Sequence, residues 1–238
     1  MARPTTYPDT FPPDPPRDLD EQAAITDADW TAFDSLTEIT NHWKRPGWSP
    51  TTRAYYWLLS ITDPCFVEQA VRCQAAVLDH VGISAFDFVA PDAFHLTLGR
   101  VGLVDACSDQ DLERLTATVQ ASAPSAFELT ALPLAGSRGA LRYSVAPWAP
   151  VIALHQVLAA SSAACGLAPM KSSSGLRPHI GIGYCHQTLP MERVQPVVHS
   201  LRALPPVPTV CDRVDLVAMR REGQSYRWDS THSVRLRH

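Results

Sequence analysis

The pattern of apolar and polar positions divides the chain from residue 53 onward into short strands and amphipathic helices. Apolar runs of strand length alternate with segments whose apolar residues recur at helical spacing. Turn-forming residues separate these segments, and Ser108 stands where it can cap a helix at 109–122. The expected strands are 54–62, 94–104, 127–134, 140–147, 177–185, 210–220 and 225–236, and the expected helices are 65–81, 109–122, 150–165 and 191–203.

Two pairs of expected strands are joined by turns short enough for hairpins. The turn AGSRG links 127–134 to 140–147, and REGQ links 210–220 to 225–236. Hairpins mixed with isolated helices predict an α+β fold with antiparallel sheets, because a doubly wound parallel fold needs a regular alternation of strand and helix.

The N-terminal 50 residues differ from the rest of the chain. Six prolines among the first 20 residues predict a disordered or polyproline arm over 1–22. A helix is expected at 27–39, capped by Thr26 or Asp27, and the Trp-rich loop 41–50 follows it. The segment 23–50 is therefore expected to dock on a main domain that spans 51–238.

Composition and cysteine spacing limit the classes of protein. A chain of 238 residues with 45% hydrophobic content can bury a core, and no apolar run approaches the roughly 20 residues of a membrane helix. The six cysteines have no CxxC or zinc-finger spacing, which favours reduced thiols and no metal site. We therefore expect a cytoplasmic monomer with no membrane partner.

The distribution of charge along the chain does not exclude a nucleic-acid partner. The net charge is −4, but residues 1–50 hold nine of the 24 acidic and four of the 20 basic residues. The remainder of the chain is therefore about neutral, and the acidic excess belongs to the N-terminal segment.

Two of the expected strands carry matching histidine motifs. FHLTLGR places His95, Thr97 and Gly99 in the same register as His179, Gly181 and Gly183 of PHIGIGY. A lone histidine on a strand is more often a packed core residue, but two in matching context predict an internal duplication that faces two imidazoles across a cleft. Strand alternation places His95 and Thr97 on one face.

These motifs resemble those of the 2H phosphoesterase superfamily, in its bacterial 2′-5′ RNA ligase-like and cyclic phosphodiesterase branch. HLTL at 95–98 matches the family's H-x-[T/S]-hydrophobic motif, and HIGI at 179–182 matches it without the hydroxyl. HWKRPGW and RVDLVAMRREGQSYRW are similar to actinobacterial members. The resemblance covers about 41–238, and implies a pseudo-twofold, two-lobed α+β fold in which antiparallel sheets line a central groove and helices lie outside.

The resemblance also implies a chemistry. His95 and His179 would act as general acid and base on a 2′,3′-cyclic or 2′-5′ phosphodiester, with Thr97 holding a phosphate oxygen and with no cofactor or metal. The partner would be RNA, tRNA included, or a small nucleotide, and the enzyme would be a hydrolase. Tyr226 and Trp228 either stack a nucleobase or pack in the core. Which histidine is the acid stays open.

Gly181 is the departure from the family motif, since it provides no hydroxyl. Either Gly181 simply leaves space at this position, or another side chain provides the missing phosphate contact. The candidates for that contact are Lys171, Arg177, Tyr143 and the serines at 172–174. Arg100 and Tyr184 are chemically suitable, but strict alternation points them away from the histidine face. Either a bulge turns them inward or they are structural.

Three functions remain open. The first is the phosphodiesterase just described. The second is a re-purposed fold that performs acid/base chemistry on a nucleotide-linked or tRNA-linked substrate in specialised metabolism. The third is a non-catalytic module that binds RNA or a nucleotide.

Overall fold

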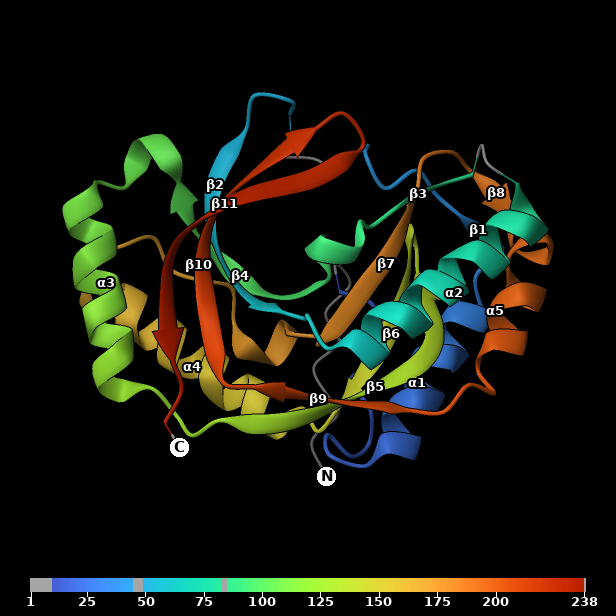
Figure 1. Ribbon diagram of the computed structural model, residues 1–238, viewed down its shortest axis with the longest axis horizontal. Coiled ribbons are helices and arrows are strands. Elements are labelled where there is room, and N and C mark those ends of the chain that lie inside the picture. Colours follow the sequence, from blue (N-terminus) through green and yellow to red (C-terminus); the bar gives the residue numbers. More distant parts are fainter. Residues whose placement is uncertain (1–9, 45–48, 83–84, 238) are drawn as a thin grey trace.

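Two antiparallel sheets meet at the centre of the molecule (Figure 1). The computed structural model of the protein describes residues 10–44, 49–82 and 85–237. The first sheet has the order β11-β10-β2-β4 and the second has the order β3-β7-β6-β5-β9. The predicted α+β class with antiparallel sheets is confirmed. The first sheet comprises β2 (Arg53–Ser60), β4 (His95–Leu103), β10 (Arg213–Glu222) and β11 (Ser225–Arg235); the second comprises β3 (Phe86–Phe88), β5 (Phe127–Ser137), β6 (Ala140–Ala146), β7 (His179–Cys185) and β9 (Val207–Cys211); β1 (Glu38–Ile39) pairs with β8 (Leu189–Pro190).

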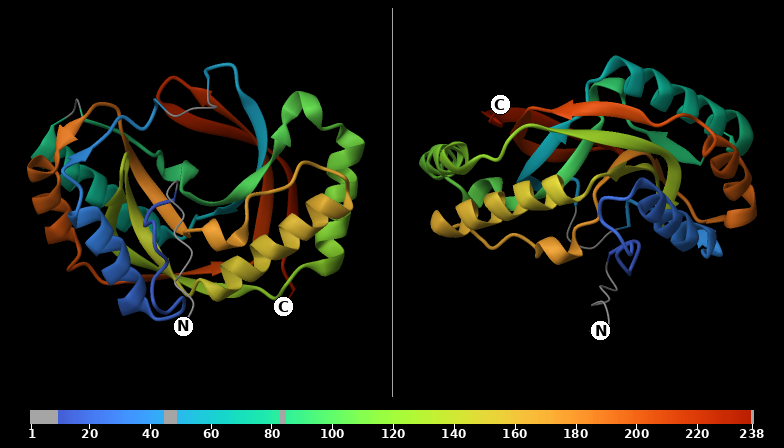
Figure 2. Two further views of the ribbon diagram at one scale, coloured as in Figure 1. Left: turned by 180° about the vertical axis from the view of Figure 1, so that it is seen from behind. Right: turned by 90° about the horizontal axis from the view of Figure 1, so that it is seen from below.

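Helices are exchanged between the two sheets (Figures 1 and 2). The helix α2 follows β2 of the first sheet but contacts β7 and β9 of the second, whereas α4 follows β6 of the second sheet but contacts β4 of the first. Each sheet is therefore packed against a helix that follows a strand of the other sheet in the chain. The helices are α1 (Gln22–Asp34), α2 (Pro64–Val81), α3 (Asp109–Ser122), α4 (Ala149–Ala164) and α5 (Gln195–Leu201), with short 3₁₀ helices η1 (Pro91–Ala93), η2 (Val104–Ala106), η3 (Ser173–Gly175) and η4 (Met191–Arg193).

Local sequence explains where the longer helices begin and end. The Asp63 carboxylate accepts the backbone N–H groups of Cys65 and Phe66, and Gly82 ends α2 with a φ of 92°, which favours glycine. Ser108 forms a reciprocal capping box with Asp111 at the start of α3, as the sequence predicts.

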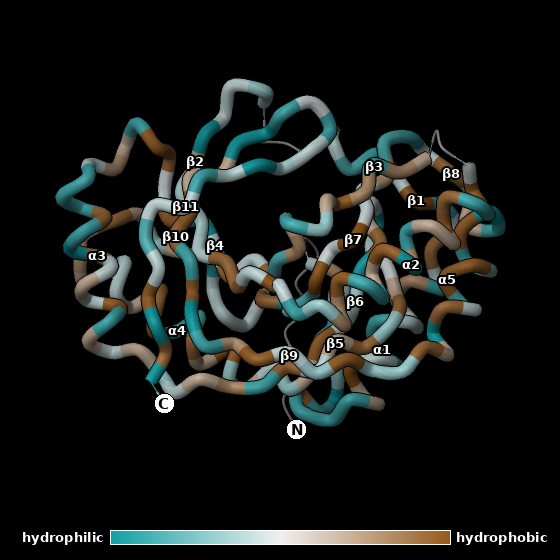
Figure 3. The backbone as a smooth tube through the Cα atoms, viewed as in Figure 1, coloured by the Kyte–Doolittle hydropathy of each residue, from teal (hydrophilic) through white to brown (hydrophobic). Residues whose placement is uncertain are grey.

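One continuous hydrophobic core joins the lobes. It includes Trp57 and Leu96 from the first sheet and Tyr143 and Ile180 from the second, all essentially excluded from solvent. The hydrophilic residues gather instead on the exposed segments, such as the tip of the β10–β11 hairpin (Figure 3). Each of the six cysteines is a free thiol.

The N-terminal helix differs from the prediction of 27–39. It spans Gln22–Asp34, its N-cap is Glu21, and Glu38–Ile39 forms a strand that pairs with β8. Ile39 is buried through this strand pairing, so its three-residue spacing from Leu36 does not indicate helix.

Two C-terminal predictions are also corrected. The expected strand 210–220 is interrupted at Asp212, because the chain crosses there from β9 in the second sheet to β10 in the first. The expected helix 191–203 is divided into η4 and α5, with Pro196 near the start of the latter. Proline fits the first turn of a helix, where no N–H bond is lost.

Residues 10–22 lie within the predicted disordered arm, and for them the prediction is wrong. Proline has no N–H but keeps its carbonyl, and the buried Arg177 donates to the carbonyls of Pro12 and Pro13. Arg142 likewise donates to the carbonyl of Phe11. The remaining arm residues, 1–9, and residues 45–48 of the Trp-rich loop, including Trp48, lie outside the described residues.

Candidate active site

The two motif histidines occupy equivalent positions at the first residues of β4 and β7. His95 Nδ1 lies 2.9 Å from the carbonyl oxygen of Ala93, and His179 Nδ1 lies 2.7 Å from that of Arg177. A carbonyl only accepts hydrogen bonds, so each Nδ1 carries the hydrogen. Nε2 is therefore the atom of each ring that can gain or lose a proton near neutral pH.

Matching β-bulges follow both histidines. Against β2, the register shifts at Leu98, and against β6 it shifts at Ile182. Each shift reverses the alternation of faces beyond it. Arg100 therefore lies on the face of His95, and Tyr184 lies on the face of His179. Of the two alternatives left open by the sequence, a bulge that turns these side chains inward is the one that the structure has.

Side chains from elsewhere in the chain support the second bulge. Gln74, buried on α2, donates from its amide nitrogen to the carbonyl oxygens of Val89 and Ile182, at 2.8 and 2.9 Å. A Cβ on Gly183 would lie 3.0 Å from the Phe88 ring, so glycine permits this close approach. The bulge is thus specified by tertiary contacts as well as by the local sequence.

A small cavity between the lobes is bordered by His95 from β4 and Tyr184 from β7. Its volume is about 10 Å³, enough for roughly one water molecule. Trp228, from the β10–β11 hairpin, places its ring 4.8 Å from that of His95 in an edge-on contact. Only 7% of His95 is exposed. This burial lowers the pKa of His95, and the hydrogen bond to Ala93 opposes the shift only in part.

An aromatic cluster joins the hairpin to the second lobe. The His42 ring packs 4.2 Å from the Tyr184 ring, and His42 Nε2 lies 3.1 Å from the Tyr226 hydroxyl. Trp43 contacts both tyrosine rings. The sequence around His42 carries no local signal of this contact, because its loop lies 142 residues upstream of Tyr184.

The structure places some predicted site residues beside the histidines. Thr97 and Arg100 are exposed on the face of β4 that carries His95, and Gly181 lies on the His179 face of β7. Their positions are compatible with contact to a bound substrate.

Three other predicted substrate contacts are not on the histidine faces or are otherwise engaged. Tyr143 is buried on the opposite face of β6, where its hydroxyl donates to Gln69. The buried Arg177 guanidinium binds backbone carbonyls, including those of Pro12 and Pro13. Lys171 is exposed in a loop whose Met170 packs beneath Gly99, on the face of β4 away from His95. The polar groups of Tyr143 and Arg177 are thus already used in hydrogen bonds, to Gln69 and to backbone carbonyls respectively.

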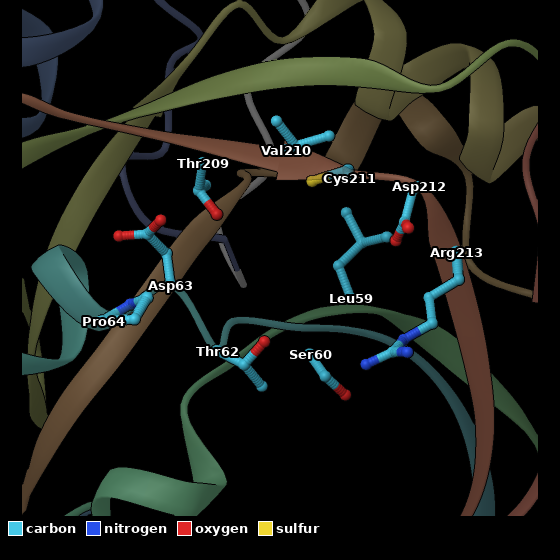
Figure 4. A pocket seen from close by; sticks show the side chains of 10 residues that line it. All are labelled: Leu59, Ser60, Thr62, Asp63, Pro64, Thr209, Val210, Cys211, Asp212 and Arg213. Atoms are coloured by element: carbon cyan, nitrogen blue, oxygen red, sulfur yellow. The ribbon is translucent and has the colours of Figure 1, made fainter. Parts of the chain in front are cut away.

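A larger cavity of about 280 Å³ lies where β2 leads into α2 and β9 leads into β10. Figure 4 shows the Arg213 side chain extending toward Ser60, and both belong to the lining. Ser60 is the strand partner of His95, so the cavity begins one strand away from that histidine. Neither motif histidine lines it.

Two kinds of feature are absent from the described ranges. No helix there is both long and apolar enough to cross a membrane. Within the same ranges, no three His, Cys, Asp or Glu side chains are grouped so that they could hold a metal ion.

A family comparison places these motifs in a known superfamily. The family model described as 2′-5′ RNA ligase superfamily matches residues 76–223, which is more than half of the chain and contains both histidines. No curated protein matches the chain at a significant level.

Solved structures share the fold at low sequence identity. LigT from Escherichia coli, complexed with 3′-AMP, is 20% identical, with a TM-score of 0.56 over 78% of this chain and 98% of that chain. TT0787 from Thermus thermophilus is 15% identical, with a TM-score of 0.56 over 77% and 98%. The MHV ns2 PDE domain is 10% identical, with a TM-score of 0.50 over 69% and 97%. About a fifth of this chain thus extends beyond the fold shared with LigT.

Proposed function

Because the chain belongs to the 2′-5′ RNA ligase superfamily of 2H phosphoesterases, we propose that it is a phosphodiesterase with His95 and His179 as its acid and base. The bond cleaved is a 2′,3′-cyclic or 2′-5′ phosphodiester of RNA or a small nucleotide. Neither role requires a metal ion, since both are proton transfers.

The observation that carries this proposal is the equivalence of the two histidines. Both start a bulged strand, and both are oriented by a backbone carbonyl two residues earlier. The strands β4 and β7 lie side by side where the lobes meet. Packing alone does not require this duplicated orientation, whereas acid/base catalysis from two sides of a phosphorus does.

We assign the base to His95, because its lowered pKa keeps the ring neutral near pH 7. His95 Nε2 takes a proton from water as the water oxygen forms a bond to phosphorus. The bond from phosphorus to the leaving ribose oxygen breaks, and His179 gives that oxygen its proton. Thr97, exposed on the His95 face, donates a hydrogen bond to a non-bridging oxygen.

Nucleotide recognition rests on the aromatic side chains around His95. Tyr226, Trp228 and Phe88 border the cavity, and such rings stack on nucleobases without sequence preference. LigT has been crystallised with 3′-AMP, with ATP and with NADP+, which supports a nucleotide ligand for the shared fold. A tRNA substrate, a monomeric state and a cytoplasmic location stay predictions.

The direct test is hydrolysis of a panel of 2′,3′-cyclic nucleotides and 2′-5′-linked dinucleotides in the presence of a chelator. We expect His95→Ala and His179→Ala each to lower kcat by about 10²–10⁴-fold, as for the loss of a general acid or base. His80→Ala, an exposed histidine at the end of α2, is the matched control and should retain wild-type rates. Full activity in either motif variant would overturn the proposal.

One observation favours the alternative of a non-catalytic nucleotide-binding module. The cavity beside His95, which Tyr226 and Trp228 border, has room for about one water molecule, and this is less than the volume of a phosphate group. The same panel separates the two functions: a module of this kind would bind 3′-AMP with equal affinity in wild type and in His95→Ala, and would hydrolyse nothing.

A further inference from the structure

We propose that the hydroxyl of Tyr184 supplies the phosphate contact that Gly181 lacks. This inference rests on the proposed function, and it names the residue that completes the second motif. Thr97 provides a hydroxyl two residues after His95, but Gly181 provides none two residues after His179.

The backbone of β7 makes this substitution possible. His179, Gly181 and Tyr184 pair with Ser144, Arg142 and Ala140 of β6, which are alternate residues and share one face. Without the bulge at Ile182, Tyr184 would point to the opposite face. The bulge therefore brings a side chain from three residues further along the strand back to the motif position.

The Tyr184 side chain reaches the space above Gly181. A Cβ built on Gly181 would lie 3.4 Å from the Tyr184 hydroxyl oxygen. A serine or threonine hydroxyl at this position would extend one bond beyond that Cβ, into the region that the tyrosine hydroxyl borders. The phenolic oxygen thus lies near the place where the family motif puts its second hydroxyl.

Aromatic contacts hold the Tyr184 ring in this orientation. Its centroid lies 4.2 Å from that of His42, 5.3 Å from that of Trp43 and 5.4 Å from that of Tyr226. A ring fixed on three sides loses little conformational freedom when its hydroxyl binds a ligand. A tyrosine hydroxyl both donates and accepts hydrogen bonds, so it can donate to a non-bridging phosphate oxygen as negative charge develops there.

The test moves the hydroxyl between the two positions. Tyr184→Phe keeps the ring and removes only the oxygen, and we expect it to lower kcat about 10²-fold, the usual effect of losing one such donor. Gly181→Ser in the Tyr184→Phe background returns a hydroxyl to the motif position and should restore at least a tenth of the wild-type kcat. Gly181 does not have a positive φ, and the 3.4 Å approach is an ordinary contact, so serine fits the backbone.

Two controls make the result decisive. Tyr55→Phe removes a hydroxyl from the buried face of the first sheet, opposite to the face of His95, and should leave kcat unchanged. Binding of inorganic phosphate, measured by calorimetry, should weaken in Tyr184→Phe and recover in the double variant, independently of turnover. If wild type hydrolyses the panel but Tyr184→Phe matches it, or if Gly181→Ser restores nothing, this inference is wrong. If wild type hydrolyses nothing and binds no phosphate, the proposed function itself fails.

Discussion

At the scale of single residues, a buried ion pair joins α1 to the second sheet. Asp29 of α1 and Arg142 of β6 are each about 2% exposed, with their charged atoms 2.8 Å apart. Ser144 donates a further hydrogen bond to the same carboxylate. Because Ser144 and Arg142 pair with His179 and Gly181, this ion pair supports the strand that carries the candidate active site.

Replacing Asp29 by Asn should therefore destabilise the protein strongly. The guanidinium of Arg142 would stay buried without its counter-charge, which typically costs about 3–5 kcal/mol. Chemical denaturation monitored by circular dichroism measures the change in the free energy of unfolding. Glu68→Gln, which breaks the exposed Glu68–Arg72 pair on α2, is the control and should not shift the denaturation midpoint measurably. Equal effects of the two substitutions would contradict this account of the buried pair.

The pH dependence of activity belongs to the same scale. A histidine base works only when neutral, so kcat/KM falls as pH drops through its pKa. Burial lowers the pKa of His95, which places this loss below the ordinary value of about 6.5. Trp228→Ala exposes the ring and should move the midpoint upward toward 6.5. A pH profile of kcat/KM for both proteins is the measurement, and a wild-type acidic limb centred at or above pH 6.5 would contradict the assignment.

At the scale of elements, residues 11–13 of the N-terminal arm pack against the second lobe. Arg177 donates to the carbonyls of Pro12 and Pro13, and its own backbone carbonyl accepts the Nδ1–H of His179. These residues of the arm are thus linked to the orientation of His179 through Arg177. The bulges are the second feature at this scale, since they turn Arg100 and Tyr184 to the histidine faces.

Removal of residues 1–16 and the substitution Arg177→Gln should each abolish the hydrogen bonds between the Arg177 guanidinium and the arm carbonyls. We expect each to lower the free energy of unfolding by about 2 kcal/mol, the usual worth of hydrogen bonds to a charged group, and to lower kcat as His179 loses its fixed orientation. The combined variant should lose less than the sum of the two, because the truncation removes acceptors that Arg177 uses. Arg17→Gln, an exposed change in the adjoining segment, is the control. Full additivity in thermal unfolding would show that the arm and Arg177 act separately.

At the scale of the whole molecule, the exchange of α2 and α4 makes each lobe depend on the other. The hydrophobic core runs through both sheets. The helix α2 covers apolar residues of the second sheet and α4 covers those of the first, so unfolding of one lobe would expose the core of the other. The aromatic cluster around Tyr184 and Tyr226 adds a second connection between the lobes.

Thermal unfolding should accordingly be one cooperative transition, although the fold has two lobes. Differential scanning calorimetry should give a single peak whose calorimetric enthalpy equals the van't Hoff enthalpy. Near-ultraviolet circular dichroism should report the same midpoint, since tryptophans lie in both lobes. Two resolved peaks would mean that the lobes are independent folding units.

The sequence by itself determined the α+β class, most strand and helix positions and the two histidines, because hydrophobic periodicity and the H-x-[T/S] motif are local signals. It did not determine which way Arg100 and Tyr184 point, since a bulge is defined only by the register of the neighbouring strand. The arm was misjudged for a related reason: proline-rich composition predicts disorder, but the arginines that bind its carbonyls lie more than 120 residues away. Tertiary structure decided these points, because each depends on contacts between segments distant in the chain.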